Sequence, residues 1–102
     1  MIFNITTRHF ELTDEIREFT EKKFRKLNVF DNLIVKVDIV LSNEGSLKIA
    51  EGKVSLRGSF LIAKTQSHDI FLAITQLADK LLKQLKSFDG KLKSKKRINR
   101  VS

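Results

Sequence analysis

The chain of 102 residues contains no cysteine, tryptophan or tyrosine, and it has only two histidines. Without cysteine the protein forms no disulfide and no thiolate metal site, which is compatible with a reducing compartment. The first residues lack the cationic segment and apolar run of a signal peptide. No apolar run is long enough to cross a bilayer, so we expect a cytoplasmic protein with no membrane partner.

The residues that commonly carry catalysis are also scarce. His9 and His68 both lie in expected connections, and their spacing matches no metal-binding motif. The four glycines are scattered, so no glycine-rich loop is available to hold a phosphate group. The acidic residues between Asp14 and Glu21 are typical of a solvent-exposed helix face. We therefore predict no catalytic residues, no metal site, no cofactor and no enzymatic activity.

Basic residues are abundant, and their excess over acidic residues lies in one half of the chain. Residues 1–50 carry eight Lys or Arg and eight Asp or Glu, whereas residues 51–102 carry twelve and four. The formal net charge of +8 therefore comes from the second half. One-sided positive charge favours a polyanionic partner, with nucleic acid as the first candidate and anionic lipid as the second.

The periodicity of apolar residues predicts strands and helices that fit one domain. We expect strands at residues 1–6, 33–41, 47–57 and 60–65, and helices at residues 14–27 and from residue 70 onward. Thr13 and Asp69 are the expected N-caps of the helices. The apolar phase of the third strand shifts at Glu51-Gly52, which predicts a β-bulge there.

The second helix is expected to end at Asp89-Gly90. Residues 1–90 then form a single α/β domain, and residues 91–102 form a basic C-terminal tail that we expect to be flexible. From Asp89 onward the chain has six basic residues and one acid, so the tail contributes much of the net charge.

The order of elements, β-α-β-β-β-α, predicts an α+β fold. A helical crossover leaves the first two strands parallel, and two hairpins add the other two strands. Each helix then runs back over the sheet, so the two helices lie parallel on one face of a four-stranded sheet. This layout is similar to that of a double-stranded-RNA-binding domain.

Parallel helices place their C-terminal halves side by side, and both halves are basic. The first contributes Lys22, Lys23, Arg25 and Lys26, and the second contributes Lys80, Lys83 and Lys86. A lysine-rich helix face alone is often only solubilising. Two such faces that merge, next to a basic tail, favour nucleic-acid contact. Because no aromatic residues are interleaved with the lysines, folded RNA backbone is a better candidate than stacked single strands.

Two segments and a strand resemble the ribosome hibernation-promoting factor family in its short form. This family includes the ribosome-associated translation inhibitors and was long described as sigma-54 modulation proteins. The first segment contains Ile5-Thr6, Arg8-His9, the run from Glu11 to Phe19 and the run from Lys22 to Leu27. The second contains the run from Asp69 to Ile74, Asp79-Lys80-Leu81, Lys83-Gln84-Leu85 and Lys91-Leu92-Lys93. Between them, Ala50-Glu51 and Val54-Ser55-Leu56 resemble the family's third strand.

The resemblance implies a ribosome-binding domain at residues 1–90 and a role in stationary-phase or stress-induced ribosome hibernation. It implies binding to 16S rRNA of the small ribosomal subunit, in the channel of mRNA and tRNA, so that translation initiation is blocked. A separate ribosome modulation factor is a candidate second partner, and we expect a monomer off the ribosome. The family's basic positions correspond to Arg8, Lys23, Lys26, Lys80, Lys83, Lys91 and Lys93. The predicted patch adds Lys22, Arg25 and Lys86.

The sequence departs from the family pattern in places. Phe71 and Thr75 stand where Tyr and Asp are frequent, and residues 87–90 replace a more basic run. Two other functions stay open: a general double-stranded-RNA-binding domain, and a regulatory protein-interaction module.

Overall fold

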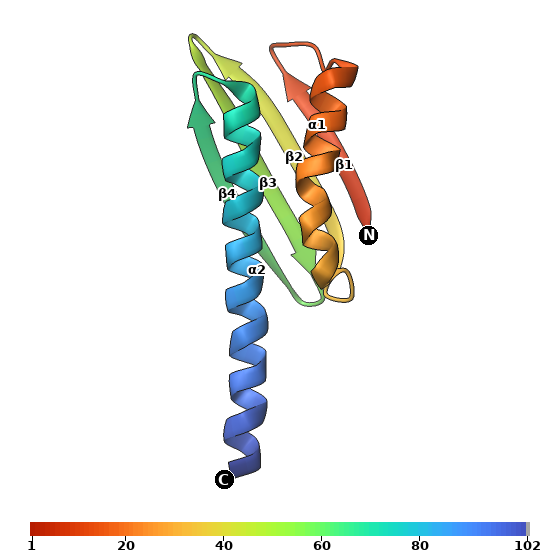
Figure 1. The fold of residues 1–102 in the computed structure, drawn as a ribbon, viewed down its shortest axis with the longest axis vertical. Coiled ribbons are helices and arrows are strands. Elements are labelled where there is room, and N and C mark those ends of the chain that lie inside the picture. The colour runs from red at the N-terminus through yellow and green to blue at the C-terminus, as the bar shows by residue number, and fades with distance from the viewer. Residues whose placement is uncertain (102) are drawn as a thin grey trace.

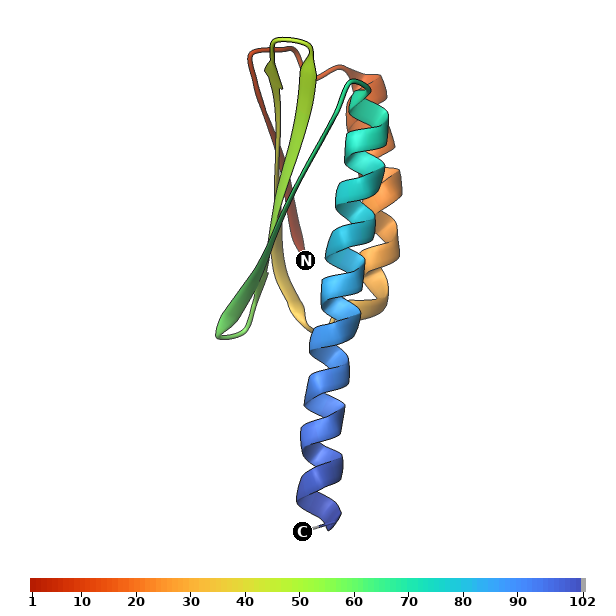
Figure 2. The same ribbon diagram turned by 90° about the vertical axis from the view of Figure 1, so that its left-hand side faces the viewer.

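A four-stranded sheet carries two helices on one of its faces (Figure 1, Figure 2). The computed structural model describes the backbone of residues 1–101 and the side chains of residues 1–90. The elements are β1 (Ile2–Arg8), α1 (Asp14–Phe24), the 3-10 helix η1 (Arg25–Phe30), β2 (Ile34–Glu44), β3 (Leu47–Leu56), β4 (Ser59–Ser67) and α2 (Ile70–Val101). The α+β class and the order of elements are as predicted.

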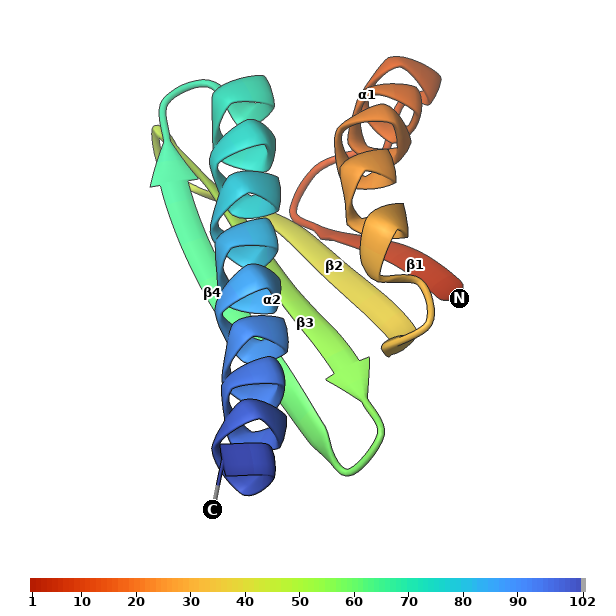
Figure 3. The ribbon, with the colours of Figure 1, turned by 60° about the horizontal axis from the view of Figure 1, so that its bottom comes forward.

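The strands follow one another across the sheet in the order β1-β2-β3-β4. β1 is parallel to β2, with Phe3 beside Val37, and the other two pairings are antiparallel. The hairpin turns contain Gly45 and Gly58, whose positive φ angles of 60° and 74° suit glycine. Both helices begin at the same end of the sheet and run parallel (Figure 1, Figure 3). The predicted topology is therefore confirmed.

The core lies between the sheet and the helices. Ile74, Leu77 and Leu81 of α2 are completely buried against strand residues that include Val37 and Val54. Their spacing of three and four residues puts them on one side of the helix. This apolar stripe fixes the rotation of α2 about its axis, and so decides which way its lysines face.

The predicted β-bulge at Glu51-Gly52 is wrong. Gly52 lies in register between Ile39 of β2 and Ala63 of β4, and the register shifts instead between Ile34 and Lys36. A Cβ atom on Gly52 would lie 2.8 Å from Cδ1 of Leu81. Gly52 therefore permits the close approach of α2 to β3. The glycine is needed for its small size, and β3 has no inserted residue at this position.

Both predicted helix caps are present. The Thr13 side chain accepts a hydrogen bond from Ile16 N at 3.2 Å, and Asp69 Oδ1 accepts one from Phe71 N at 2.9 Å. The predicted end of the second helix is wrong, because α2 continues through Gly90 to Val101. A glycine lowers helix stability by about 1 kcal/mol relative to alanine and does not by itself end a helix. The side chains of residues 91–102 lie outside the described residues, and the domain boundary at residue 90 stays a prediction.

Candidate nucleic-acid interface

The basic residues of the first cluster lie where α1 passes into η1. Lys22 and Lys23 are in the last turn of α1, and Arg25 and Lys26 begin η1. Lys26 reaches across to α2, where its Nζ atom is ion-paired and hydrogen-bonded with Asp79 Oδ1. The two helices are thus held together where the first cluster lies.

The aromatic side chains of α1 and α2 pack at the same junction. The rings of Phe19 and Phe71 meet edge to face, with centroids 4.9 Å apart. Lys23 Nζ lies 5.4 Å from the centroid of Phe19, within the range of a cation–π contact. Lys22 borders the hollow above these rings. Phe19 is therefore a packing residue, as its place in the apolar stripe indicates.

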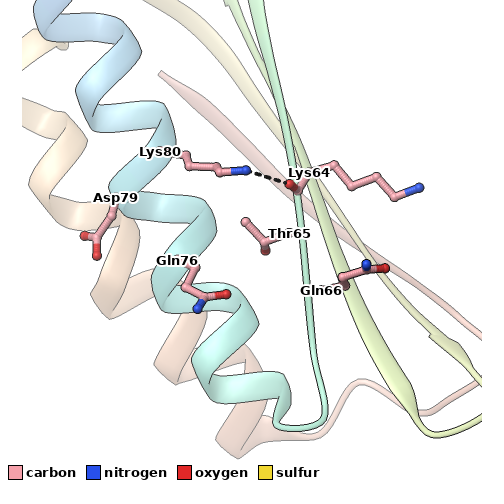
Figure 4. A pocket seen from close by; sticks show the side chains of 6 residues that line it. All are labelled: Lys64, Thr65, Gln66, Gln76, Asp79 and Lys80. Atoms are coloured by element: carbon pink, nitrogen blue, oxygen red, sulfur yellow. Dashed lines mark hydrogen bonds between the residues drawn. The ribbon is translucent and has the colours of Figure 1, made fainter.

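Lys80 and Lys83 face the other way, toward β4. Lys80 Nζ donates a hydrogen bond to Lys64 O at 3.2 Å (Figure 4). Lys83 lines a hollow between α2 and β4 together with Lys80 and Gln84. Asp79 points to the opposite side of the helix in Figure 4. Lys80 therefore points away from the Asp79–Lys26 ion pair, whereas Lys83 follows Asp79 by one helical turn and lies beside it on the surface of α2.

The remaining basic residues are spread around this layer. Lys86 follows Asp79 by seven residues, nearly two helical turns, and so lies on the same side of α2 as Asp79. Arg25 borders a hollow with Met1 and Phe3, which places it toward β1. The predicted cluster is thus divided among three flanks of the helical layer: the junction of α1 with α2, the β4 side and the β1 side.

Two groups of the predicted site lie apart or outside the described side chains. Arg8 ends β1, beside Ser42 of β2, at the end of the sheet where the helices begin (Figure 1). It therefore lies away from the C-terminal half of α1. The side chains of Lys91 and Lys93 are outside the described residues.

Comparisons with known proteins connect this fold and surface to one family. The model of the family "Sigma 54 modulation protein / S30EA ribosomal protein" matches residues 3–93. The chain belongs to this family. Its members named below are ribosome-associated factors and not enzymes, in agreement with the predicted absence of enzymatic activity.

Relatives with similar sequences are named ribosome hibernation promoting factors. The protein of Klebsiella oxytoca is 38% identical over 93 residues, which cover 91% of this chain and 98% of that protein. The protein of Escherichia coli K12 is 34% identical over the same shares of the two chains. The resemblance found in the sequence is therefore confirmed at the level of the family.

Two solved structures share the fold. A ribosomal subunit interface protein from Coxiella burnetii superimposes with a TM-score of 0.83 at 27% identity, covering 88% of this chain and 99% of that one. The N-terminal domain of Thermus thermophilus Protein Y superimposes with a TM-score of 0.78 at 32% identity, covering 85% and 97%.

Sequence reasoning missed residues on the β4 side of α2. Gln84 Nε2 donates a hydrogen bond to Ile62 O at 3.2 Å, and Gln76 lies beside Lys80 in the same hollow. Gln76, Lys80 and Gln84 recur every four residues, which indicates a shared helix flank. This four-residue spacing is visible in the sequence, but a search for charged residues does not include glutamine side chains.

The described residues contain neither a cluster of metal ligands nor a membrane-spanning helix. Over residues 1–90, no three His, Asp or Glu side chains gather to hold a metal ion. Within the same residues, every buried side-chain nitrogen or oxygen has a hydrogen-bond partner. No helix in the described part of the chain has the length and apolar content needed to cross a membrane.

Proposed function

We propose that this protein is a ribosome hibernation factor that binds 16S rRNA of the small ribosomal subunit. Its membership of the family supports the proposal, as do relatives that match over 98% of their own length and are named ribosome hibernation promoting factors. The observation that carries the proposal is the basic helical layer on a rigid sheet. This layer offers ammonium groups to phosphates.

The proposed mechanism is occupation of space. Lysines of α1, η1 and α2 neutralise rRNA phosphates, and the folded domain fills the channel that mRNA and tRNA require. Initiation is then blocked while ribosomes are stored under stress or in stationary phase. Ribosome association also places the protein in the cytoplasm, where we propose that it is a monomer off the ribosome. A separate modulation factor is the proposed partner for ribosome pairing.

We assign rRNA contact to the predicted residues according to their places in the structure. Lys22, Lys23, Lys26 and Lys86 serve the junction of α1 and α2, Lys80 and Lys83 serve the β4 side, and Arg25 serves the β1 side. Arg8 contacts RNA separately, from the other end of the sheet. Lys91 and Lys93 are proposed to extend the contacts beyond the described side chains.

The proposal is tested by sedimentation. The purified protein is run through a gradient with small subunits and with whole ribosomes at physiological salt, with excess RNA duplex as competitor. Co-migration with the small subunit that survives the competitor is the expected result. Loss of co-migration to the duplex would replace the proposal with general double-stranded-RNA binding. Association that persists after RNase digestion of the rRNA would point to a protein-interaction module.

A matched pair of variants connects the binding to the helical layer. Lys23→Glu should weaken co-migration, because it places a carboxylate at the junction of α1 and α2. Lys53→Glu makes the same charge change on the sheet face opposite the helices, where Lys53 stacks over Phe60. It should leave co-migration nearly unchanged. Equal effects of the two variants would contradict the assignment to the helical layer.

A further inference from the structure

The sheet face opposite the helices carries exposed apolar side chains. Figure 2 shows both helices on one side of the sheet, and no helix of the described chain lies against the other side. Strand pairing puts one row of residues across the sheet: Ile2 of β1, Lys36 of β2, Ser55 of β3 and Phe60 of β4. The residues on either side of Ser55 in β3 are buried in the core, so this row faces outward. Ile62, two residues after Phe60, lies on the same face in the next row.

The register shift in β2 adds another apolar residue to this row. It leaves two residues of β2, Val35 and Lys36, opposite Ser55 of β3. The exposed apolar side chains here are Ile2, Val35, Phe60 and Ile62, with exposed fractions of 58%, 48%, 55% and 59%. They are four of the seven large apolar side chains that stay exposed in the described residues. Exposed apolar residues that occur singly are common, whereas a group of them marks an interaction surface. We call these four residues the sheet patch.

Basic side chains border the sheet patch. Lys53 Nζ lies 4.7 Å from the centroid of the Phe60 ring. Arg57 lies in the turn between β3 and β4, at the same end of the sheet. Within residues 1–90, neither Lys53 nor Arg57 forms an ion pair. Both cations are therefore available to a partner that docks on the patch.

The acidic side chains in the middle of this face are already paired. Asp38 is ion-paired with Lys36 at 3.6 Å, and Glu51 with Lys64 at 4.0 Å. The charge that stays uncompensated beside the patch is therefore positive. A partner that carries carboxylates next to apolar side chains would complement it.

The spacing of the sheet patch fits an α-helix laid across the strands. Neighbouring strands are about 4.8 Å apart, so the row from Phe60 to Ile2 spans about 14 Å. Helical residues three or four positions apart lie on one side of a helix and are separated by about 4.5 to 6 Å along its axis. Each strand can thus receive one apolar side chain of the helix, and the small Ser55 leaves space for one between Val35 and Phe60. The inner face of the same sheet packs against helices through apolar side chains too.

We infer that the sheet patch docks an acidic amphipathic helix of a partner protein. A phosphate backbone would neutralise Lys53 and Arg57 but has no apolar surface to bury Ile62, whereas an apolar helix stripe buries it. The choice of a protein over an anionic membrane rests on the proposed function, because a ribosome-bound molecule has proteins as neighbours. The helical layer then contacts rRNA while the opposite face of the sheet holds the partner.

The test is titration of the full chain with a fluorescently labelled peptide, followed by anisotropy. The peptide is a helix of about 18 residues, with leucine at every third and fourth position and glutamate on both sides of that stripe. We expect saturable binding. Ile62→Ser should weaken it about tenfold, as expected for the loss of an apolar contact in the centre of an interface.

Leu72→Ser is the matched control, because Leu72 is 47% exposed but belongs to the helical layer. It should leave peptide affinity nearly unchanged. Lys53→Glu should weaken peptide binding about fivefold, the upper range for an exposed charge interaction. The same Lys53→Glu variant should still co-sediment with the small subunit, which separates the sheet patch from the helical layer.

Several results would overturn the sheet patch as a protein-docking site. They are absence of saturable binding, equal losses in Ile62→Ser and Leu72→Ser, and equal affinity for a peptide with lysine in place of glutamate. Binding to phosphatidylglycerol vesicles that Ile62→Ser abolishes would replace the protein partner with a membrane. Dimerisation that Ile62→Ser abolishes would replace it with a second copy of this chain.

The proposed function stands or falls by a different measurement. None of these results on the free protein alters its co-sedimentation with the small subunit. Conversely, peptide binding by a protein that fails to co-sediment would keep the sheet patch and refute the proposed function.

Discussion

Lys26 of η1, directly after α1, is ion-paired with Asp79 of α2. The partners are separated by 53 positions in the sequence, so the pair forms only when the helices are in place. It also puts a negative charge at the junction of two basic clusters. Asp79 thus stabilises the arrangement of the helices and at the same time opposes the approach of a polyanion.

Replacement of Asp79 by asparagine should therefore lower the stability of the fold and raise its affinity for RNA. The free energy of unfolding should fall by at most about 1 kcal/mol, because the Asp79 side chain is 61% exposed and such pairs are weak. Affinity for RNA duplex should rise, because Lys26 is released and a repulsive charge is removed. Urea unfolding and filter binding measure the two effects. Asp38→Asn, which removes the partner of Lys36 on the opposite sheet face, is the control and should not raise RNA affinity.

Gly52 is expected to resist substitution. Gly52→Ala would place a Cβ atom 2.8 Å from Leu81 Cδ1, so α2 must shift or Leu81 must leave its rotamer. Overpacking of this kind costs about 1–3 kcal/mol, which thermal or urea unfolding will detect.

Gly90→Ala is the matched control for that variant. Nothing lies within 4 Å of the Cβ position at Gly90, and the residue is inside α2. Alanine should raise stability there, by up to about 1 kcal/mol. Destabilisation by both variants would contradict the explanation from close packing.

The Thr13 cap should contribute measurably to α1. Its side chain accepts the Ile16 N–H, which otherwise has no partner in the first turn. Thr13→Ala should lower the unfolding free energy by about 1 kcal/mol, whereas Thr13→Ser should retain most of the stability. A serine variant as unstable as the alanine variant would show that the hydroxyl is not what stabilises the helix.

The edge of β4 is protected by Lys80 and Gln84, whose side chains bond its outward carbonyls. Changing both residues to alanine should expose an unpaired strand edge and promote self-association at high protein concentration. Analytical ultracentrifugation will measure it. The double variant Lys83→Ala and Ser87→Ala borders the same hollow and should stay monomeric. Association of both variants would point to loss of surface polarity rather than to an uncovered edge.

Ribosome binding should depend on salt in proportion to the number of phosphate contacts. Removal of one contacting lysine, as in Lys22→Ala, should reduce the slope of log affinity against log salt by about 0.7 to 0.9. Lys36→Ala, on the face opposite the helices, should leave the slope unchanged. A slope that is the same in both variants and the parent protein would remove Lys22 from the interface.

Local patterns in the sequence were enough to predict the four strands, the two α-helices, both caps and the topology. They did not predict that the first helix passes into the 3-10 helix η1 at Arg25, or that α2 continues past Gly90. Thr13 and Asp69 act on amides two or three residues away, and the apolar stripe of α2 is periodic along one helix. Such features depend on residues that are close together in the chain, so a short segment of sequence is enough to predict them.

Apart from the helix ends, the errors concern contacts between elements. The need for glycine at residue 52 comes from Leu81, nearly thirty positions later, and resembles a bulge signal when β3 is considered alone. The direction in which Lys80 points depends on the packing of α2 over β4, and not on its place in a basic run. The number of basic residues predicted a cationic surface. It could not predict which side of α2 each lysine faces.

The parallel course of α1 and α2 has a consequence for the encounter with a ligand. Their peptide dipoles add, with Asp14, Glu15 and Asp69 near the positive ends and Lys22 and Lys23 in the last turn of α1. Close to the helix ends, these acidic and basic side chains oppose the field of the backbone dipoles. At longer range the side-chain charges dominate, and they give the molecule a dipole moment along its helices. A polyanion will therefore orient the protein before the two make contact. Added salt should then lower the association rate as well as weaken the complex.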